Sequence, residues 1–177
     1  MKTTKLDNDK YYTPIDLAKE CIDKTFEIIG KENITEIIEP SAGNGSFSNQ
    51  IANCIAYDLV PESDNIKTAD FLDMKLGYKS GRLFIGNPPF GVHNKLVVDF
   101  YDKCCDCGDY IAFILPISCY KNDIKLYKFD LIYSEDLGLR YYTDRELHCC
   151  FNIYRRPDSG AFNLKPNYEL NEITIIE

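Results

Sequence analysis

The sequence has 177 residues, a formal net charge of −8 and a pI near 4.8. This length fits one domain with its own core and excludes two full-sized domains, so we expect a single domain over residues 1–177, with 157–177 as a C-terminal tail or edge element. The acidic balance would repel a phosphate backbone over most of the surface, so any nucleic-acid contact must be local or shared with a basic partner.

The first expected element is a helix that begins at Thr13-Pro14, with a hydroxyl N-cap and proline at the first helical position, and that ends at Gly30. Residues 35–39 form a β-branched run that predicts a short strand leading into a glycine loop. Residues 47–52 then predict a short helix. The order strand, glycine loop, helix is typical of a ligand-binding α/β fold.

Six more strands and one helix are expected after this loop. The strands cover 54–57, 66–69, 82–86, 110–115, 129–133 and 149–154, and the helix covers 96–105. The apolar run at 173–176 fits an edge strand, a packed tail or a contact for a partner. Strands that alternate with helices predict an α/β fold with a doubly wound, mostly parallel seven-stranded sheet, in which ligands bind at the carboxyl ends of the strands.

The eight cysteines fit a disulfide scaffold, a zinc site or buried thiols. The hydrophilic first residues and the lack of an apolar run of membrane-spanning length favour a reduced, intracellular protein of the cytoplasm or nucleus. Whether a host, a virus or a phage encodes it stays open. Cys104 and Cys107 have the spacing of zinc ligands. They lie near an expected helix end, where thiols often pack as small apolar side chains, so we predict no metal and no membrane segment.

The tetrapeptide Asn87-Pro88-Pro89-Phe90 directly follows the apolar strand 82–86. An exocyclic amino group of a nucleobase, or a side-chain amide nitrogen, is a poor nucleophile because its lone pair is delocalised. The Asn87 side-chain oxygen and the Pro88 carbonyl can accept both of its hydrogens, and the prolines hold these acceptors still. Phe90 can stack on a base rotated out of its helix. The segment therefore predicts positional and electrostatic catalysis on an amino nitrogen.

Further polar residues follow other strands at the same predicted edge of the sheet. Two glycines in the loop after strand 35–39 let backbone approach a ligand closely, but the third glycine of dinucleotide-binding loops is absent, which disfavours NAD and FAD. Asp58 ends the next strand, where a carboxylate can accept from both hydroxyls of a ribose. Asp70 can accept from an adenine amino group while Phe71 packs against the ring.

These segments, in this order, resemble S-adenosylmethionine-dependent amino-methyltransferases of the DNA adenine-N6 type. The resemblance covers about residues 11–156 and implies a Rossmann-like class I methyltransferase fold, S-adenosyl-L-methionine as cofactor and DNA adenine as substrate. The target amino group would be held by the catalytic residues Asn87, Pro88, Pro89 and Phe90. The cofactor would contact Tyr12, Thr13, Pro14, Glu39, Pro40, Ser41, Ala42, Gly43, Asn44, Gly45, Phe47, Asp58, Leu59, Asp70, Phe71 and Asn87.

The sequence departs from this family in lacking a separate target-recognition region after the catalytic domain. This favours single-stranded or relaxed-sequence substrates, or a partner subunit for recognition. RNA adenine, a protein glutamine amide and a non-catalytic cofactor-binding subunit stay open as alternatives, although glutamine enzymes usually carry tyrosine where Phe90 stands. His93 fits either the target pocket or a solvent-facing position. The lysines that fit either phosphate contacts or a solvated surface are Lys95, Lys121, Lys125 and Lys128.

Overall fold

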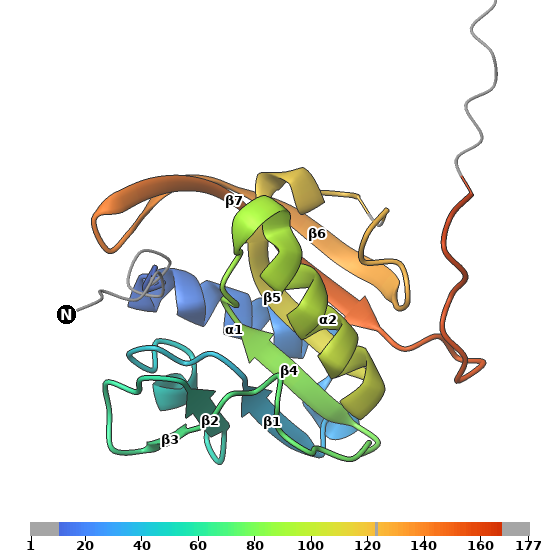
Figure 1. Cartoon of the computed structure of the whole chain (residues 1–177), viewed down its shortest axis with the longest axis horizontal. Helices are drawn as coiled ribbons and strands as arrows, with labels where there is room; N and C mark the ends of the chain where they lie inside the picture. The colour runs from blue at the N-terminus through green and yellow to red at the C-terminus, as the bar shows by residue number, and fades with distance from the viewer. Residues whose placement is uncertain (1–10, 123, 168–177) are drawn as a thin grey trace, which may run out of the picture.

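The structure is a computed structural model that describes residues 11–122 and 124–167 (Figure 1). Its helices are α1 (Ile15–Ile29) and α2 (Lys95–Cys107), and its strands are β1 (Glu36–Glu39), β2 (Ile55–Asp58), β3 (Ile66–Thr68), β4 (Arg82–Gly86), β5 (Tyr110–Pro116), β6 (Asp130–Tyr142) and β7 (Arg145–Arg155). Single 3-10 turns are η1 (Lys31–Asn33), η2 (Ser48–Gln50), η3 (Val92–Asn94) and η4 (Ile117–Cys119). The expected element at 173–176 lies outside the described residues.

All seven strands form one sheet in the order β3-β2-β1-β4-β5-β7-β6. The neighbours from β3 to β5 pair in parallel, whereas β7 is antiparallel to both β5 and β6. The prediction of a mostly parallel seven-stranded α/β sheet is confirmed. Chain order reverses between β1 and β4, and this switch point is where open α/β sheets bind ligands, beyond the carboxyl ends of the strands.

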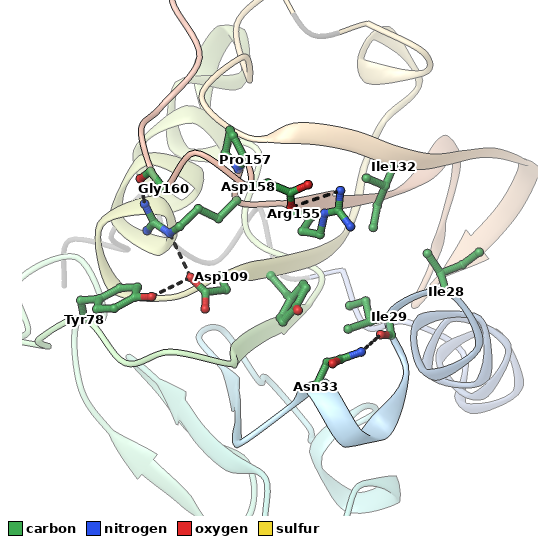
Figure 2. Close-up of a pocket in the computed structure, with 12 residues that line it drawn as sticks. Ile28, Ile29, Asn33, Tyr78, Asp109, Ile132, Arg155, Pro157, Asp158 and Gly160 are labelled. Atoms are coloured by element: carbon green, nitrogen blue, oxygen red, sulfur yellow. Dashed lines mark hydrogen bonds and ion pairs between the residues drawn. The ribbon is translucent and has the colours of Figure 1, made fainter.

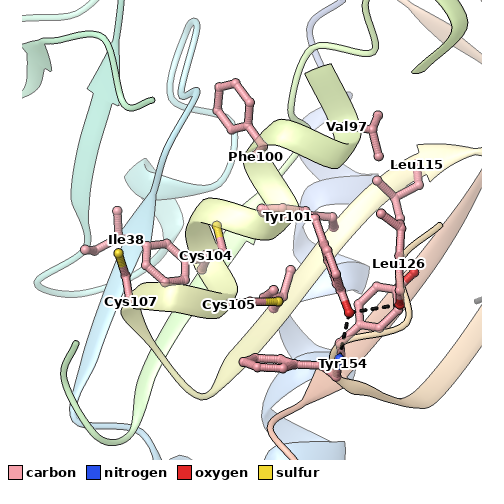
Figure 3. Close-up of a cluster of buried hydrophobic side chains, with 14 of the residues drawn as sticks. Ile38, Val97, Phe100, Tyr101, Cys104, Cys105, Cys107, Leu115, Leu126 and Tyr154 are labelled. Atoms are coloured by element: carbon pink, nitrogen blue, oxygen red, sulfur yellow. Dashed lines mark hydrogen bonds between the residues drawn. The ribbon is translucent and has the colours of Figure 1, made fainter. Parts of the chain in front are cut away.

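The two helices cover opposite faces of the sheet (Figure 1). Alternation along β4 explains this arrangement, since Leu83 and Ile85 pack with α1 while Phe84 packs with α2. Figure 3 shows the layer beneath α2, where Tyr101 donates a hydrogen bond to the carbonyl oxygen of Leu126 at 2.9 Å. Both faces of the central strands are therefore buried, as their nearly continuous apolar sequences require.

The cysteine side chains are part of these two packed layers. Cys104 and Cys105 lie between α2 and the sheet (Figure 3), while Cys21 and Cys149 belong to the layer under α1. Burial raises the pKa of all four thiols. Within residues 11–122 and 124–167, no group of three or more His, Cys, Asp or Glu side chains is arranged to hold a metal ion.

Two local predictions near the N-terminus are wrong. Helix α1 begins at Ile15, and Pro14, with φ −53° and ψ 140°, takes the N-cap position that was expected for Thr13. The Thr13 hydroxyl instead accepts a hydrogen bond from Asn87. The helix expected over 47–52 is only the turn η2, because Ile51 already has an extended conformation with φ −118° and ψ 117°.

Strands β6 and β7 are much longer than the expected strands 129–133 and 149–154, and they form a hairpin arm. The sequence of the outer part of this arm has no apolar strand pattern, because that part is exposed on at least one face and carries polar residues. The hairpin turn carries Thr143 with φ +61°. Residues 157–167 form no strand, and Asn163 donates its backbone N–H to Lys128 O at 2.9 Å just before β6. Neither described helix is long and apolar enough to span a bilayer.

Candidate active site

The glycine loop after β1 and the carboxylate after β2 are joined directly. Asp58 accepts hydrogen bonds from Gly43 N at 2.7 Å and from Val60 N at 2.9 Å, one on each carboxylate oxygen. A carboxylate offers about four acceptor positions, so two remain for a ligand. This arrangement fits the expected recognition of two ribose hydroxyls at Asp58.

The glycine loop needs its glycines for both conformation and space. Gly43 has φ +53°, and a Cβ atom placed on it would lie 3.0 Å from Cε1 of Tyr12. Gly45 has φ +83°, and a Cβ atom there would lie 2.6 Å from Nδ2 of Asn49. The Tyr12 ring therefore lies against the loop, and its hydroxyl donates to the carboxylate of Glu62. Tyr12 and Gly43, two of the expected cofactor contacts, thus lie next to each other.

Glu39 lies buried beneath this loop, with 2% of its surface exposed. Its Oε2 accepts a hydrogen bond from Ser48 N at 2.8 Å. Burial raises the pKa of Glu39 to about 8, the nearby charge of Asp58 also raises it, and the hydrogen bond from Ser48 N opposes the shift. In the free chain Glu39 is therefore mainly protonated at neutral pH.

Asn87 is oriented by the segment that precedes α1. Its Nδ2 donates to Tyr11 O at 3.3 Å and to Thr13 Oγ1 at 3.2 Å. The carbonyl of Tyr11 can only accept, so the nitrogen of the amide must face it and the Asn87 Oδ1 must face away. The Asn87 oxygen, which is expected to accept from the target amino group, therefore takes part in neither of these two hydrogen bonds.

The rest of the tetrapeptide sits between the two packed layers. Pro88 is buried, and the partly exposed Phe90 packs against both core clusters. Gly91 follows with φ +68°, and a Cβ atom there would lie 2.8 Å from Cγ of Leu96. His93, at φ +54°, is exposed in the turn η3. The backbone after Phe90 is thus forced into a sharp bend before α2 begins.

The segment after β3 matches its prediction only in part. Asp70 is exposed, and its Oδ1 accepts from Leu72 N at 3.0 Å. Phe71 is buried in the core, where its ring stacks on Phe100 with centroids 5.5 Å apart and meets Phe84 edge-on at 5.6 Å. The Phe71 ring is therefore part of the core and is not exposed for stacking on an adenine.

Two of the four lysines considered for phosphate contacts are paired with acids. Lys95 forms an ion pair with Asp99 at 2.7 Å, and Lys128 with Asp102 at 3.0 Å. Lys121 and Lys125 are exposed. The structure also adds residues that the sequence analysis did not assign to the site, namely Tyr11, Ser46, Glu62, Thr143 and Arg145.

The larger hollow of the surface lies away from the residues that carry chemistry. A hollow of about 390 Å³ lies near the amino end of β5, where Arg156 pairs with Asp109 at 2.9 Å and Tyr78 donates to the same carboxylate at 3.0 Å (Figure 2). Its main charges are thus already paired. A second hollow of about 100 Å³ adjoins Gly45 and Ser46. We assign the candidate site to the carboxyl edge of β1, β2 and β4, because the glycine loop, Asp58 and Asn87 stand at the ends of these strands.

No protein-family model and no curated protein matches the chain in sequence. Solved structures share its fold. A proposed RNA methyltransferase from Pyrococcus horikoshii matches with a TM-score of 0.67 and 15% identity over 88% of this chain and 90% of that one. A proposed class I S-adenosylmethionine-dependent methyltransferase from Listeria monocytogenes gives 0.65 and 14% over 92% and 65%, and the 23S rRNA methyltransferase ErmE gives 0.56 and 11% over 84% and 70%. The chain therefore has the Rossmann-like fold of class I methyltransferases.

Proposed function

We propose that this chain transfers a methyl group from S-adenosyl-L-methionine to the exocyclic N6 amino group of adenine in DNA. The observation that carries the proposal is the orientation of Asn87. Its amide nitrogen is used by Tyr11 and Thr13, so its oxygen is left as an acceptor beside the rigid Pro88. Two fixed acceptors suit an amino group whose two hydrogens must be held.

The residues at the switch point suit the proposed cofactor. The two remaining acceptor positions of Asp58 fit the hydroxyls of its ribose, and the exposed carboxylate of Asp70 fits its adenine amino group. The glycine loop keeps its backbone free of a Cβ atom at Gly43, where the Tyr12 ring lies beside it. When bound, S-adenosylmethionine supplies an electrophilic methyl group.

The chain's own residues have limited chemical tasks in this proposal. Asn87 and Pro88 accept hydrogen bonds from the target amino group and turn its lone pair toward the methyl donor. Phe90 stacks on the flipped base and fixes its plane. No strong general base is needed, because the amino proton leaves to water after the nitrogen has attacked. The mechanism is therefore positioning of the two reactants.

RNA adenine is the second candidate substrate, because two of the similar structures are described as RNA methyltransferases. A base in single-stranded DNA or RNA is already unpaired, which avoids a flipping cost of roughly a few kcal/mol. With a net charge of −8, the chain also lacks long-range attraction to a duplex. Recognition of a duplex site would then need a basic partner subunit.

The test is methyl transfer from labelled S-adenosylmethionine to pools of DNA, RNA and protein, followed by mass spectrometry of the nucleosides. We expect N6-methyl-2′-deoxyadenosine to form, with the highest yield in single-stranded DNA. Asn87→Ala serves as the matched inactive variant, and Asn122→Ala as a control outside the site. Label on N6 of adenine in RNA alone would select the second candidate, label on glutamine would select protein, and cofactor binding without transfer to any pool would indicate a non-catalytic subunit.

A further inference from the structure

Residues 11–13, which we call the strap, lie along the candidate site. The Tyr12 ring lies against Gly43, and the strap carbonyl of Thr13 accepts a hydrogen bond from Ser46 Oγ at 2.7 Å. The strap also supplies both acceptors that orient Asn87. Its position therefore affects the glycine loop and the tetrapeptide at the same time.

The other side of the strap is held by the turn of the β6–β7 hairpin. Tyr12 donates its backbone N–H to Thr143 Oγ1 at 2.9 Å. Arg145 donates from Nη1 to the Tyr11 hydroxyl at 2.8 Å, and its guanidinium lies 5.4 Å from the centroid of the same ring. Two successive strap residues are thus held by Thr143 of the turn and by Arg145, the first residue of β7.

Thr143 holds its hydroxyl in place at a conformational cost. Its φ of +61° is rare for a β-branched residue, and such a conformation persists only where the surroundings hold it. The neighbouring Tyr142 is fully buried against the layer under α1, so the base of the turn is anchored in the core. The hairpin therefore offers the strap a fixed support.

We propose that Thr143 and Arg145 are positioning residues of the methyl-transfer site, an inference that rests on the proposed function. They act through the strap, by holding Tyr11 O and Thr13 Oγ1 where the Asn87 amide needs its two acceptors. Their contacts are with the Tyr12 backbone N–H and the Tyr11 hydroxyl, whereas the glycine loop meets the Tyr12 ring. They can therefore persist while cofactor enters and leaves.

The expected effects follow from this indirect role. Release of the strap lets the Asn87 amide rotate, which lowers kcat, and loosens Tyr12 over Gly43, which weakens cofactor binding. A residue that only stabilised the fold would change neither of these in the folded enzyme. Both effects must also appear together with faster hydrogen exchange of the Tyr12 amide, since that N–H donates directly to Thr143.

The experiment compares Thr143→Val, which loses the acceptor at nearly constant shape, with Thr143→Ser, which keeps it. Arg145→Ala and Tyr11→Phe test the second contact, and Arg140→Ala on the same hairpin is the control, because its Nε donates to Leu137 O on its own strand. We expect Thr143→Val to speed hydrogen exchange of the Tyr12 amide about three- to tenfold, a factor that corresponds to the loss of one hydrogen bond. We also expect a Kd for S-adenosylmethionine weakened by about the same factor and a lower kcat on the DNA substrate, both restored in Thr143→Ser.

Unchanged exchange at Tyr12 in both Thr143→Val and Arg145→Ala would overturn the inference, as would faster exchange with normal kcat and Kd. Failure of the parent chain to bind S-adenosylmethionine would instead overturn the proposed function, and the positioning role with it. The two failures are distinguishable because hydrogen exchange needs neither cofactor nor substrate. Thermal unfolding of each variant checks that the fold is intact.

Discussion

Gly86, the last residue of β4, packs directly on the buried side chain of Glu39 at the end of β1. A Cβ atom placed on Gly86 would lie 3.2 Å from Cγ of Glu39. The residue before Asn87 therefore touches the acid beneath the glycine loop. This contact joins the part of the site proposed for the target to the part proposed for the cofactor.

Stability should fall with rising pH because of Glu39. The pKa of Glu39 is about 8 in the folded chain, against a reference value of 4.5. Between these values the unfolded chain loses a proton that the folded chain retains, so the free energy of unfolding decreases by at most about 1.4 kcal/mol per pH unit. Glu39→Gln keeps an acceptor for Ser48 N and removes this slope. Urea unfolding at several pH values from 5 to 9 measures it.

The matched control for this experiment is Glu20→Gln, which changes an exposed acid on α1. The control should leave the slope of the parent chain in place. Equal slopes in Glu39→Gln and the parent chain would show that Glu39 is ionised over the whole range, and would remove it as the source of the pH dependence.

Asn87→Asp should be nearly inactive, although it keeps an acceptor oxygen for the substrate. The carboxylate loses both donors and places an oxygen against the Tyr11 carbonyl, which can only accept. We expect kcat to fall by about a hundredfold or more, as for other groups that position reactants, with cofactor affinity changed little. Single-turnover rates and calorimetry separate the two quantities. Turnover near that of the parent chain would contradict the proposed orientation of the amide.

Asp58→Asn should weaken binding of S-adenosylmethionine. The amide keeps one acceptor, but its NH2 group faces either Gly43 N or Val60 N, each of which is a donor. Loss of charge-assisted hydrogen bonds predicts about 1.5 to 3 kcal/mol in binding free energy. Asp64→Asn, in the exposed loop that follows, is the control. Calorimetry that finds equal affinity in both variants would exclude Asp58 from the cofactor site.

Phe90→Ala should reduce methylation of adenine by removing base stacking, worth roughly 1 to 3 kcal/mol per base. Phe90→Tyr keeps the ring and should keep most of the activity. Initial rates on matched single- and double-stranded oligonucleotides should favour the single strand for the parent chain. A strong preference for one duplex sequence would show instead that this short chain encodes recognition.

The fold, and the position of the expected site residues at one edge of the sheet, were predictable from the sequence because their signals are local. The apolar strands, the glycines after β1 and the acids after β2 and β3 are short patterns that the carboxyl edge of a parallel sheet brings together. Asn87 follows β4 at the same edge for the same reason. The seven-stranded sheet confirms this part of the prediction. The roles of the site residues stay predictions.

The contacts missed by the sequence analysis join residues far apart in the chain. Thr13 looked like a helix cap because a hydroxyl before proline is typical of one, but its partner Asn87 is 74 residues away. Thr143 reaches Tyr12 across 131 residues, and this depends on the hairpin register, which shifts at two irregularities in the pairing of β6 with β7. Phe71 could face a ligand or the core, and no local pattern distinguishes these directions.

The buried cysteine thiols can be used to measure how often the packed layers of the fold open. A thiol with a raised pKa reacts slowly with alkylating reagents, and a buried one reacts only when its surroundings open. Cys21 lies under α1 and Cys105 under α2, so their native-state labelling rates measure how often each layer separates from the sheet. Mass spectrometry of partly labelled chains would then rank the two layers by local stability, without any substitution.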